Sequence, residues 1–175
     1  MFEGWQDFFL LAGSAAAVLI GLIFVVISLL QDRSRSSVLA GSRLYMGPIV
    51  LGVSFVLALS AAGLTPGIGR GAFAAIAGAL ALWGLARGIM STAGIRRLAH
   101  LDHPPHWTDL WFYGLYPSLL YLVLGIVALT LWREWRWADE ALAAVITASL
   151  LLAIRNEWDL ITWIAPQRSE DDVER

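Results

Sequence analysis

Residues 8–30 read FFLLAGSAAAVLIGLIFVVISLL, a stretch without a single charged side chain. A helix of this length extends about 35 Å, which is enough to cross the roughly 30 Å hydrocarbon core of a bilayer. The residues before it, Phe2 to Asp7, are acidic, whereas a cleaved signal peptide begins with a basic segment. The stretch therefore predicts a membrane-spanning helix that stays part of the protein.

Four more apolar stretches of similar length follow along the chain. The predicted spans cover approximately residues 8–30, 44–63, 71–92, 109–132 and 138–165. Hydrophobic residues make up 58% of the chain and charged residues only 15%, against roughly 25% charged residues in soluble domains. We therefore predict an all-α fold, a polytopic transmembrane helical bundle. A single transmembrane domain is expected over residues 1–165, with a short acidic cytoplasmic tail over residues 166–175.

The composition excludes several classes of function. The chain has no cysteine, which rules out disulfides, thiol catalysis and thiolate metal ligands. The formal net charge is −2 and no long basic run is present, so a nucleic-acid partner is not expected. The sequence also lacks the G-x-S-x-G, H-E-x-x-H and P-loop motifs of common enzyme classes. These observations favour a protein without enzymatic activity, in contact with a lipid bilayer.

Arginine placement predicts the orientation, because the chain has no lysine and all twelve basic residues are arginines. The loops after the first and third spans, together with the tail, hold seven arginines, and the opposite loops hold three. The positive-inside rule then places the C-terminus in the cytoplasm and the N-terminus outside. The arginine-only composition also favours a bacterial source, and hence a bacterial inner-membrane location.

Tryptophans are expected at both membrane interfaces, where their amphipathic rings are enriched. Trp5, Trp132, Trp135 and Trp137 fall at the predicted outer side, and Trp107, Trp111, Trp158 and Trp163 at the inner side.

A group of polar residues interrupts the last span. If this helix enters the membrane near Ala138, Arg155 lies about 25 Å along it, close to the cytoplasmic edge of the hydrocarbon core. Two residues of other spans, Arg87 and Asp109, are expected at the same depth. We therefore predict a polar layer near the inner surface. Its members are Arg87, Asp109, Arg155, Asn156, Glu157 and Asp159.

The helical spacing of these residues suggests how they pair. Arg155 and Asp159 are four residues apart, on one helix face, and are expected to form an ion pair. Glu157 points about 160° away from Arg155 and needs another partner, for which Arg87 is the candidate. Two interpretations stay open. The layer either locks helices together and reaches toward headgroups, or it lines a cytoplasmic vestibule that binds an ion or substrate.

The three histidines of the chain fall in one predicted loop, together with a carboxylate. The candidate ligands are His100, Asp102, His103 and His106. Imidazole and carboxylate groups are common ligands of zinc, and three protein ligands are typical of a catalytic site. However, Pro104 and Pro105 prevent a simple helical arrangement, and the spacing matches no metal motif. We therefore expect no cofactor, with an interfacial loop as the main interpretation and a metal site or a pH response as alternatives.

The third span contains Gly84 and Gly88 in a G-x-x-x-G pattern. Such a pair allows two helix backbones to approach closely, either within one chain or between chains. The pattern therefore predicts helix packing at Gly84 and Gly88, and it leaves open whether the partner helix belongs to a second copy in a homo-oligomer.

Four short motifs are spread along the chain: Trp5-x-x-Phe8-Phe9, the run Gly21 to Leu29, His106-Trp107-x-Asp109 and Arg155-Asn156-x-Trp158-Asp159-Leu160. Through these motifs the sequence resembles a group of small bacterial inner-membrane proteins. The resemblance covers most of the chain and implies an inner-membrane location. It implies no activity and no functional residues.

Three functions are compatible with these patterns. The first is a homo-oligomeric channel or transporter that moves a small ion or solute through the polar layer near the cytoplasmic face. The second is a non-catalytic subunit or scaffold that binds a partner membrane protein. The third is a membrane-embedded metal enzyme, which rests on the histidine loop alone.

Overall fold

The structure is a computed structural model that describes the backbone of residues 2, 4–30, 35–98 and 107–173. The described chain is entirely helical apart from short turns. Its elements are α1 (Gln6–Leu30), α2 (Arg35–Leu64), α3 (Arg70–Leu98), α4 (Trp107–Leu110), η1 (Trp111–Leu115), α5 (Tyr116–Trp132) and α6 (Ala138–Val173). Because α4, η1 and α5 follow one another without a break, five long helical rods result.

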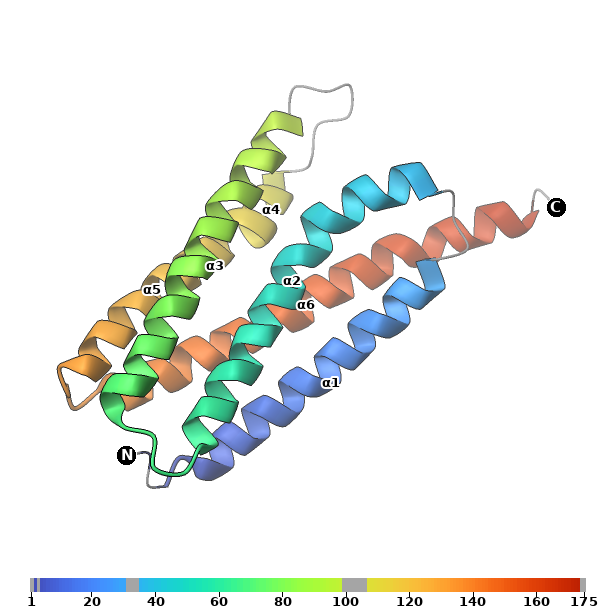
Figure 1. Ribbon diagram of the computed structural model, residues 1–175. Coiled ribbons are helices and arrows are strands. Elements are labelled where there is room, and N and C mark those ends of the chain that lie inside the picture. The colour runs from blue at the N-terminus through green and yellow to red at the C-terminus, as the bar shows by residue number, and fades with distance from the viewer. Residues whose placement is uncertain (1, 3, 31–34, 99–106, 174–175) are drawn as a thin grey trace.

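These rods form two helical hairpins joined by α6. Helix α1 packs against α2, and α3 packs against α5 along most of its length. Figure 1 shows the two hairpins close together at the end that carries the N-terminus and diverging toward the opposite end. Helix α6 contacts α1, α2 and α5, so it connects the two hairpins. The predicted all-α helical bundle is therefore observed.

Small residues hold the α1–α2 hairpin together. A Cβ atom on Gly13 would lie 3.0 Å from the Cβ of Ser60, and a Cβ on Gly63 would lie 2.8 Å from the ring of Phe9. Neither position has room for a larger residue, which is the packing expected between helices inside a bilayer, where small residues let backbones approach. The small residues of α1 are thus in close contact with α2.

Four helices of the described chain are long and apolar enough to cross a membrane. The qualifying segments are Gln6–Val25, Met46–Leu64, Arg70–Gly94 and Trp111–Trp132. Their outward faces carry large apolar side chains, such as Leu11 and Leu82, which are 70% and 73% exposed. A soluble monomer rarely exposes apolar surface on this scale. The protein is therefore a multi-span membrane protein, and lipid covers these faces.

Three helices extend beyond the predicted spans. Helix α2 begins at Arg35 and not near residue 44, α3 continues to Leu98, and α6 continues to Val173. Hydropathy detects only the part of a helix that lies in hydrocarbon, whereas Arg, Ser and Ala residues support helical turns in water as well. Most of the predicted tail, residues 166–175, therefore has a helical backbone.

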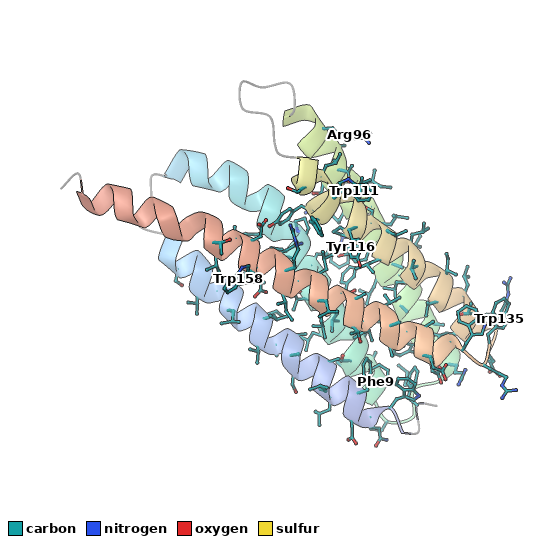
Figure 2. All side chains as sticks on the ribbon, turned by 180° about the vertical axis from the view of Figure 1, so that it is seen from behind. Phe9, Arg96, Trp111, Tyr116, Trp135 and Trp158 are labelled. Atoms are coloured by element: carbon teal, nitrogen blue, oxygen red, sulfur yellow. The ribbon has the colours of Figure 1, made fainter. Side chains whose placement is uncertain are left out.

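The end of the bundle near the N-terminus is closed by aromatic rings. Phe2 is 6% exposed, and its ring centroid lies 4.9 Å from that of Phe9 and 4.8 Å from that of Phe73. At the same end, Nη2 of Arg70 lies 3.2 Å from Oδ2 of Asp139, which links the first turns of α3 and α6. Figure 2 places Phe9 and Trp135 at this end, with Trp158 toward the other.

Candidate functional site

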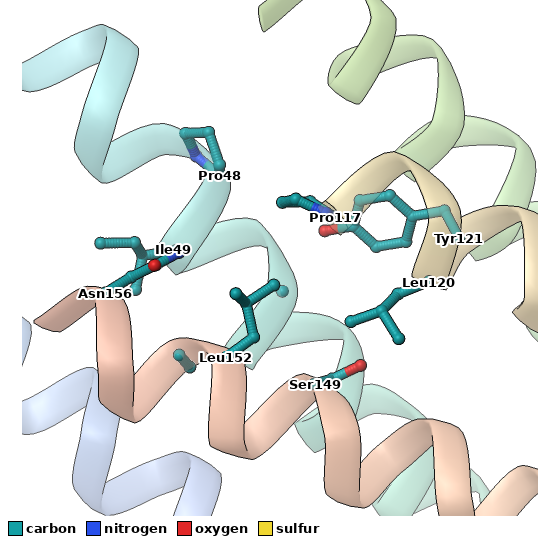
Figure 3. Close-up of a pocket in the computed structure, with 10 residues that line it drawn as sticks. Pro48, Ile49, Pro117, Leu120, Tyr121, Ser149, Leu152 and Asn156 are labelled. Carbon is teal, nitrogen blue, oxygen red and sulfur yellow. The ribbon is translucent and has the colours of Figure 1, made fainter. Parts of the chain in front are cut away.

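A cleft runs between the two hairpins and is bounded by two prolines. It consists of two adjoining cavities, both lined by Pro48 of α2 and by Pro117 and Tyr121 of α5. We call them together the proline cleft. The wide cavity has a volume of about 210 Å³ and reaches Arg87 on α3. The narrow one has a volume of about 20 Å³ and reaches Asn156 on α6, as Figure 3 shows.

Pro117 creates an irregularity in the helix that lines this cleft. Directly before it, Trp111–Leu115 form a π-helical turn, in which the N–H of Tyr116 donates to the carbonyl of Trp111. A proline has no N–H, so Pro117 cannot donate to the carbonyl four or five residues back. The main-chain N–H that would bond the carbonyl of Phe112 or of Tyr113 is therefore missing at this point of the helix.

Side chains of two other helices donate to these carbonyls. The amide nitrogen Nδ2 of Asn156 on α6 donates to the carbonyl of Phe112 at 3.1 Å. The hydroxyl of Ser91 on α3 donates to the carbonyl of Tyr113 at 3.2 Å. A buried carbonyl without a donor costs about 1–3 kcal/mol, so both contacts stabilise η1 against its neighbours. Asn156 is 2% exposed, which makes its position a fixed part of the interior.

Further contacts join α6 to η1, and we call the five residues involved the α6 clamp. The guanidinium carbon of Arg155 lies 3.4 Å from the ring centroid of Phe112, and Nη1 of Arg155 donates to Oδ1 of Asn156 at 3.1 Å. The hydroxyl of Tyr113 donates to Oδ2 of Asp159 at 3.1 Å and contacts the main-chain carbonyl of Asn156 at 3.3 Å. The clamp therefore fixes α6 to α5 by cation–π contact and hydrogen bonds.

The ion pair between Arg155 and Asp159 is a minor part of this clamp. Nη1 of Arg155 lies 4.0 Å from Oδ2 of Asp159, and the two side chains are 37% and 48% exposed. A partly exposed pair at that distance contributes at most about 1 kcal/mol. The contacts to η1 are shorter, and sequence spacing on α6 alone gives no sign of them.

Glu157 is separated from the clamp, and one of its oxygens has no hydrogen-bond partner among the residues that the structure describes. Its side chain is 6% exposed, and Oε1 is buried without a hydrogen-bond partner. At 100° per residue it falls on the same face of α6 as Ile146 and Ala153, which belong to the hydrophobic core. Among the described residues, Glu157 is therefore the only carboxylate of the predicted polar layer that lies on the core face of α6.

Arg87 does not fill the role expected for it. The structure has no ion pair between Arg87 and Glu157 among the residues whose side chains it describes. Arg87 is exposed and lines the wide cavity of the proline cleft between α2 and α3. The predicted layer thus separates into the α6 clamp, Glu157 in the core, and Arg87 at the surface.

Several predicted residues lie where little is described. The backbone of Asp109 is helical, within α4, but its side chain lies outside the described residues. His100, Asp102, His103 and His106 also lie outside them. Among the described residues there is no group of three His, Asp or Glu side chains that could hold a metal ion. The histidine site stays a prediction.

Gly84 and Gly88 pack against α5 of the same chain. A Cβ on Gly84 would lie 2.5 Å from the ring of Tyr121 and 2.8 Å from that of Phe55, and a Cβ on Gly88 would overlap the hydroxyl of Ser118. The predicted close crossing is therefore found within the chain, where it positions Tyr121 in the cleft. Self-association through another face stays a prediction.

Sequence reasoning missed the residues that complete this site. Phe112, Tyr113, Ser91 and Tyr121 were not expected in it. The useful signal is Pro117 itself, since each mid-span proline frees a carbonyl that a nearby polar side chain has to satisfy. An asparagine in an apolar stretch, such as Asn156, is the natural donor.

Comparison with protein-family models, with curated proteins and with solved structures gave no match. The resemblance to a group of bacterial inner-membrane proteins therefore stays a prediction. The function has to be argued from the cleft, the α6 clamp and Glu157. Sequence and fold together identify a small helical protein with four candidate membrane spans.

Proposed function

We propose that this protein is a five-span bacterial inner-membrane protein that moves a small cation or a proton, with Glu157 as the group that binds it. A carboxylate suits these species, because it accepts hydrogen bonds and coordinates cations through its oxygens. The site lies near the predicted cytoplasmic face, about 28 Å along α6 from Ala138.

The observation that carries this proposal is the isolation of Glu157. A carboxylate that is 6% exposed, with an unpartnered Oε1, is unfavourable unless it is protonated or binds a cation. The neighbouring polar residues Arg155, Asn156 and Asp159 already bind η1 or one another. Glu157 therefore has capacity for a ligand that the clamp residues lack.

The rest of the fold supports access from one side. The narrow cavity of the proline cleft reaches Asn156, the residue next to Glu157 on α6, although Glu157 itself lines neither cavity. The opposite end is closed by Phe2, Phe9 and Phe73. This arrangement suits a resting state with a closed outer end. Because Asn156 and Glu157 are buried within one chain, we assign the pathway to a single protomer and not to the axis of an oligomer.

Helix α6 is the fifth span in this proposal. It carries Asp139 and Glu140 in its first turn and the polar group from Arg155 to Asp159 near the other end, which lowers its hydropathy. The central part between these groups is apolar and packs against α1, α2 and α5. The polar groups at either end then lie at the two interfaces, where water and headgroups solvate charge.

Flux measurements on reconstituted protein test this function. The wild-type protein in liposomes should dissipate an imposed proton or sodium gradient faster than empty liposomes do. Glu157→Gln removes the charge and keeps the shape, and we expect it to reduce the rate at least tenfold. The matched control is Glu140→Gln, the same exchange at an exposed position of the same helix, which should transport like the wild type.

Two results would count against transport. The first is that liposomes with wild-type protein have the permeability of empty liposomes under both gradients. The second is that Glu157→Gln and the wild type dissipate the gradients at equal rates. Either result would favour the second candidate, a non-catalytic scaffold that binds a partner membrane protein. The observation on its side is the α6 clamp, in which the polar residues of α6 serve to hold helices together.

A further inference from the structure

The wide cavity of the proline cleft opens beside a lipid-facing surface. It lies between α2 and α3, with Leu51 and Pro48 on one wall and Arg87 and Met90 on the other. Met90 is 63% exposed, and Val50, next to the α2 wall, is 37% exposed. The cleft therefore borders the faces of α2 and α3 that the bilayer covers.

The size of the cavity limits what it can hold. Its volume is about 210 Å³, whereas pockets that enclose a drug-sized ligand have roughly 300–1,000 Å³. An occupant therefore places only a part of itself in the cleft and leaves the rest outside. A phospholipid does this naturally, since a segment of one acyl chain enters while the other chain stays in the bilayer.

Arg87 supplies a charge at the edge of this apolar cavity. No carboxylate lies within ion-pair distance of its guanidinium among the described residues. It is 17 residues beyond Arg70, the first residue of α3, which corresponds to about 26 Å of helix and to the edge of the hydrocarbon core in the opposite leaflet, from where a long side chain reaches the headgroups. A guanidinium at that depth binds phosphate oxygens through paired N–H donors.

We propose that the wide part of the proline cleft is a binding site for an anionic phospholipid of the predicted inner leaflet. The phosphate lies on Arg87, and a segment of one acyl chain lies along Pro48, Leu51 and Pro117. The lipid thereby fills the wide cavity between α2 of one hairpin and α3 and α5 of the other, on the side where Figure 1 shows the hairpins diverging. This site is distinct from Glu157, which lies on the core face of α6.

Lipid selectivity of the purified protein tests the site. The full-length protein in detergent is titrated with phosphatidylglycerol or with phosphatidylcholine, and bound lipid is counted by native mass spectrometry. We expect phosphatidylglycerol to bind at least tenfold more tightly, and Arg87→Gln to remove that preference. The control Arg96→Gln, an exposed arginine further along α3 that does not line the cavity, should bind as the wild type does.

Two further measurements separate the contribution of the lipid headgroup from that of the acyl chain. Leu51→Trp fills the cavity and should weaken the binding of both lipids. Inorganic phosphate at the same concentration as the lipid should not raise the thermal stability of the protein. Equal binding of the two lipids by the wild type would overturn the proposal, even if Arg87→Gln failed to fold. The proposal would also be overturned if Arg87→Gln and Arg96→Gln lost the preference for phosphatidylglycerol to the same extent. The same holds if free phosphate stabilised the protein as much as phosphatidylglycerol does.

Discussion

Asn156 on α6 donates its side-chain amide to the carbonyl of Phe112, which lies five residues before Pro117, a residue that has no N–H to donate. The proline that lines the cleft and the asparagine that holds α6 in place are therefore parts of one arrangement. Removing either residue changes what the other contributes. This dependence gives the most direct test of the α6 clamp.

Asn156→Ala should lower the free energy of unfolding by about 1–3 kcal/mol, because it removes the donor that Asn156 gives to the part-buried Phe112 carbonyl. The measurement is unfolding by SDS titration in mixed micelles. Ser149→Ala is the control, since the hydroxyl of Ser149 bonds only to the carbonyl of Val145 in its own helix. In a Pro117→Ala background, where a main-chain N–H is restored, the effect of Asn156→Ala should shrink. Strict additivity of the two substitutions would contradict the proposed link.

Gly84→Ala should destabilise the protein by about 1–3 kcal/mol, because the added Cβ meets the rings of Tyr121 and Phe55 and overpacks the α3–α5 crossing. The same SDS titration measures it. Gly21→Ala is the matched control, since nothing lies within 4 Å of a Cβ at that position. An equal stability of both variants would mean that α3 and α5 are not in close contact.

Phe2→Ala should loosen the aromatic closure at the N-terminal end. We expect the free energy of unfolding to fall by about 1–3 kcal/mol, which is at the lower end of the range for large-to-small substitutions in a core. The effect is small because the terminal segment can detach instead of leaving a cavity. Hydrogen exchange should accelerate over the first turns of α1. Phe24→Ala, at a position 65% exposed to lipid, should leave that exchange unchanged. Equal exchange in both variants would show that Phe2 is not held in the core.

The orientation is testable because the chain has no cysteine of its own. Thr65→Cys introduces a thiol in the exposed turn between α2 and α3, and Arg96→Cys introduces one near the end of α3. In intact bacterial spheroplasts, a membrane-impermeant maleimide should label position 65 at once and position 96 only after permeabilisation. The reverse order would mean that the chain is inserted with its N-terminus in the cytoplasm.

The sequence predicted the helices well because apolar length is a property of a single segment. Residues 8–30 and 109–132 match α1 and the rod from α4 to α5 closely. Helix ends outside hydrocarbon, such as the start of α2 at Arg35, carry no hydropathy signal and were placed too far inward. Helix pairing at Gly84 could be predicted from its small residues, but the identity of the partner, α5, could not.

The candidate site was predicted in part. Depth along a helix placed Arg87 and Arg155 at a similar level, but depth does not determine which way a side chain faces. The structure directs Arg87 to the α2–α3 surface and Glu157 to the core, so the pairing expected between them does not form. The contacts to Phe112 and Tyr113 depend on the π turn, and a π turn is set by tertiary packing around Pro117.

The α6 clamp has a consequence for biogenesis. The last helix carries Arg155, Glu157 and Asp159, which would disfavour its release into lipid as an isolated segment. Its partners on η1, Phe112 and Tyr113, are synthesised earlier. We therefore expect α6 to integrate only after η1 is in place beside the insertion machinery, so that the order of synthesis, and not the hydropathy of α6, brings the final helix into the membrane.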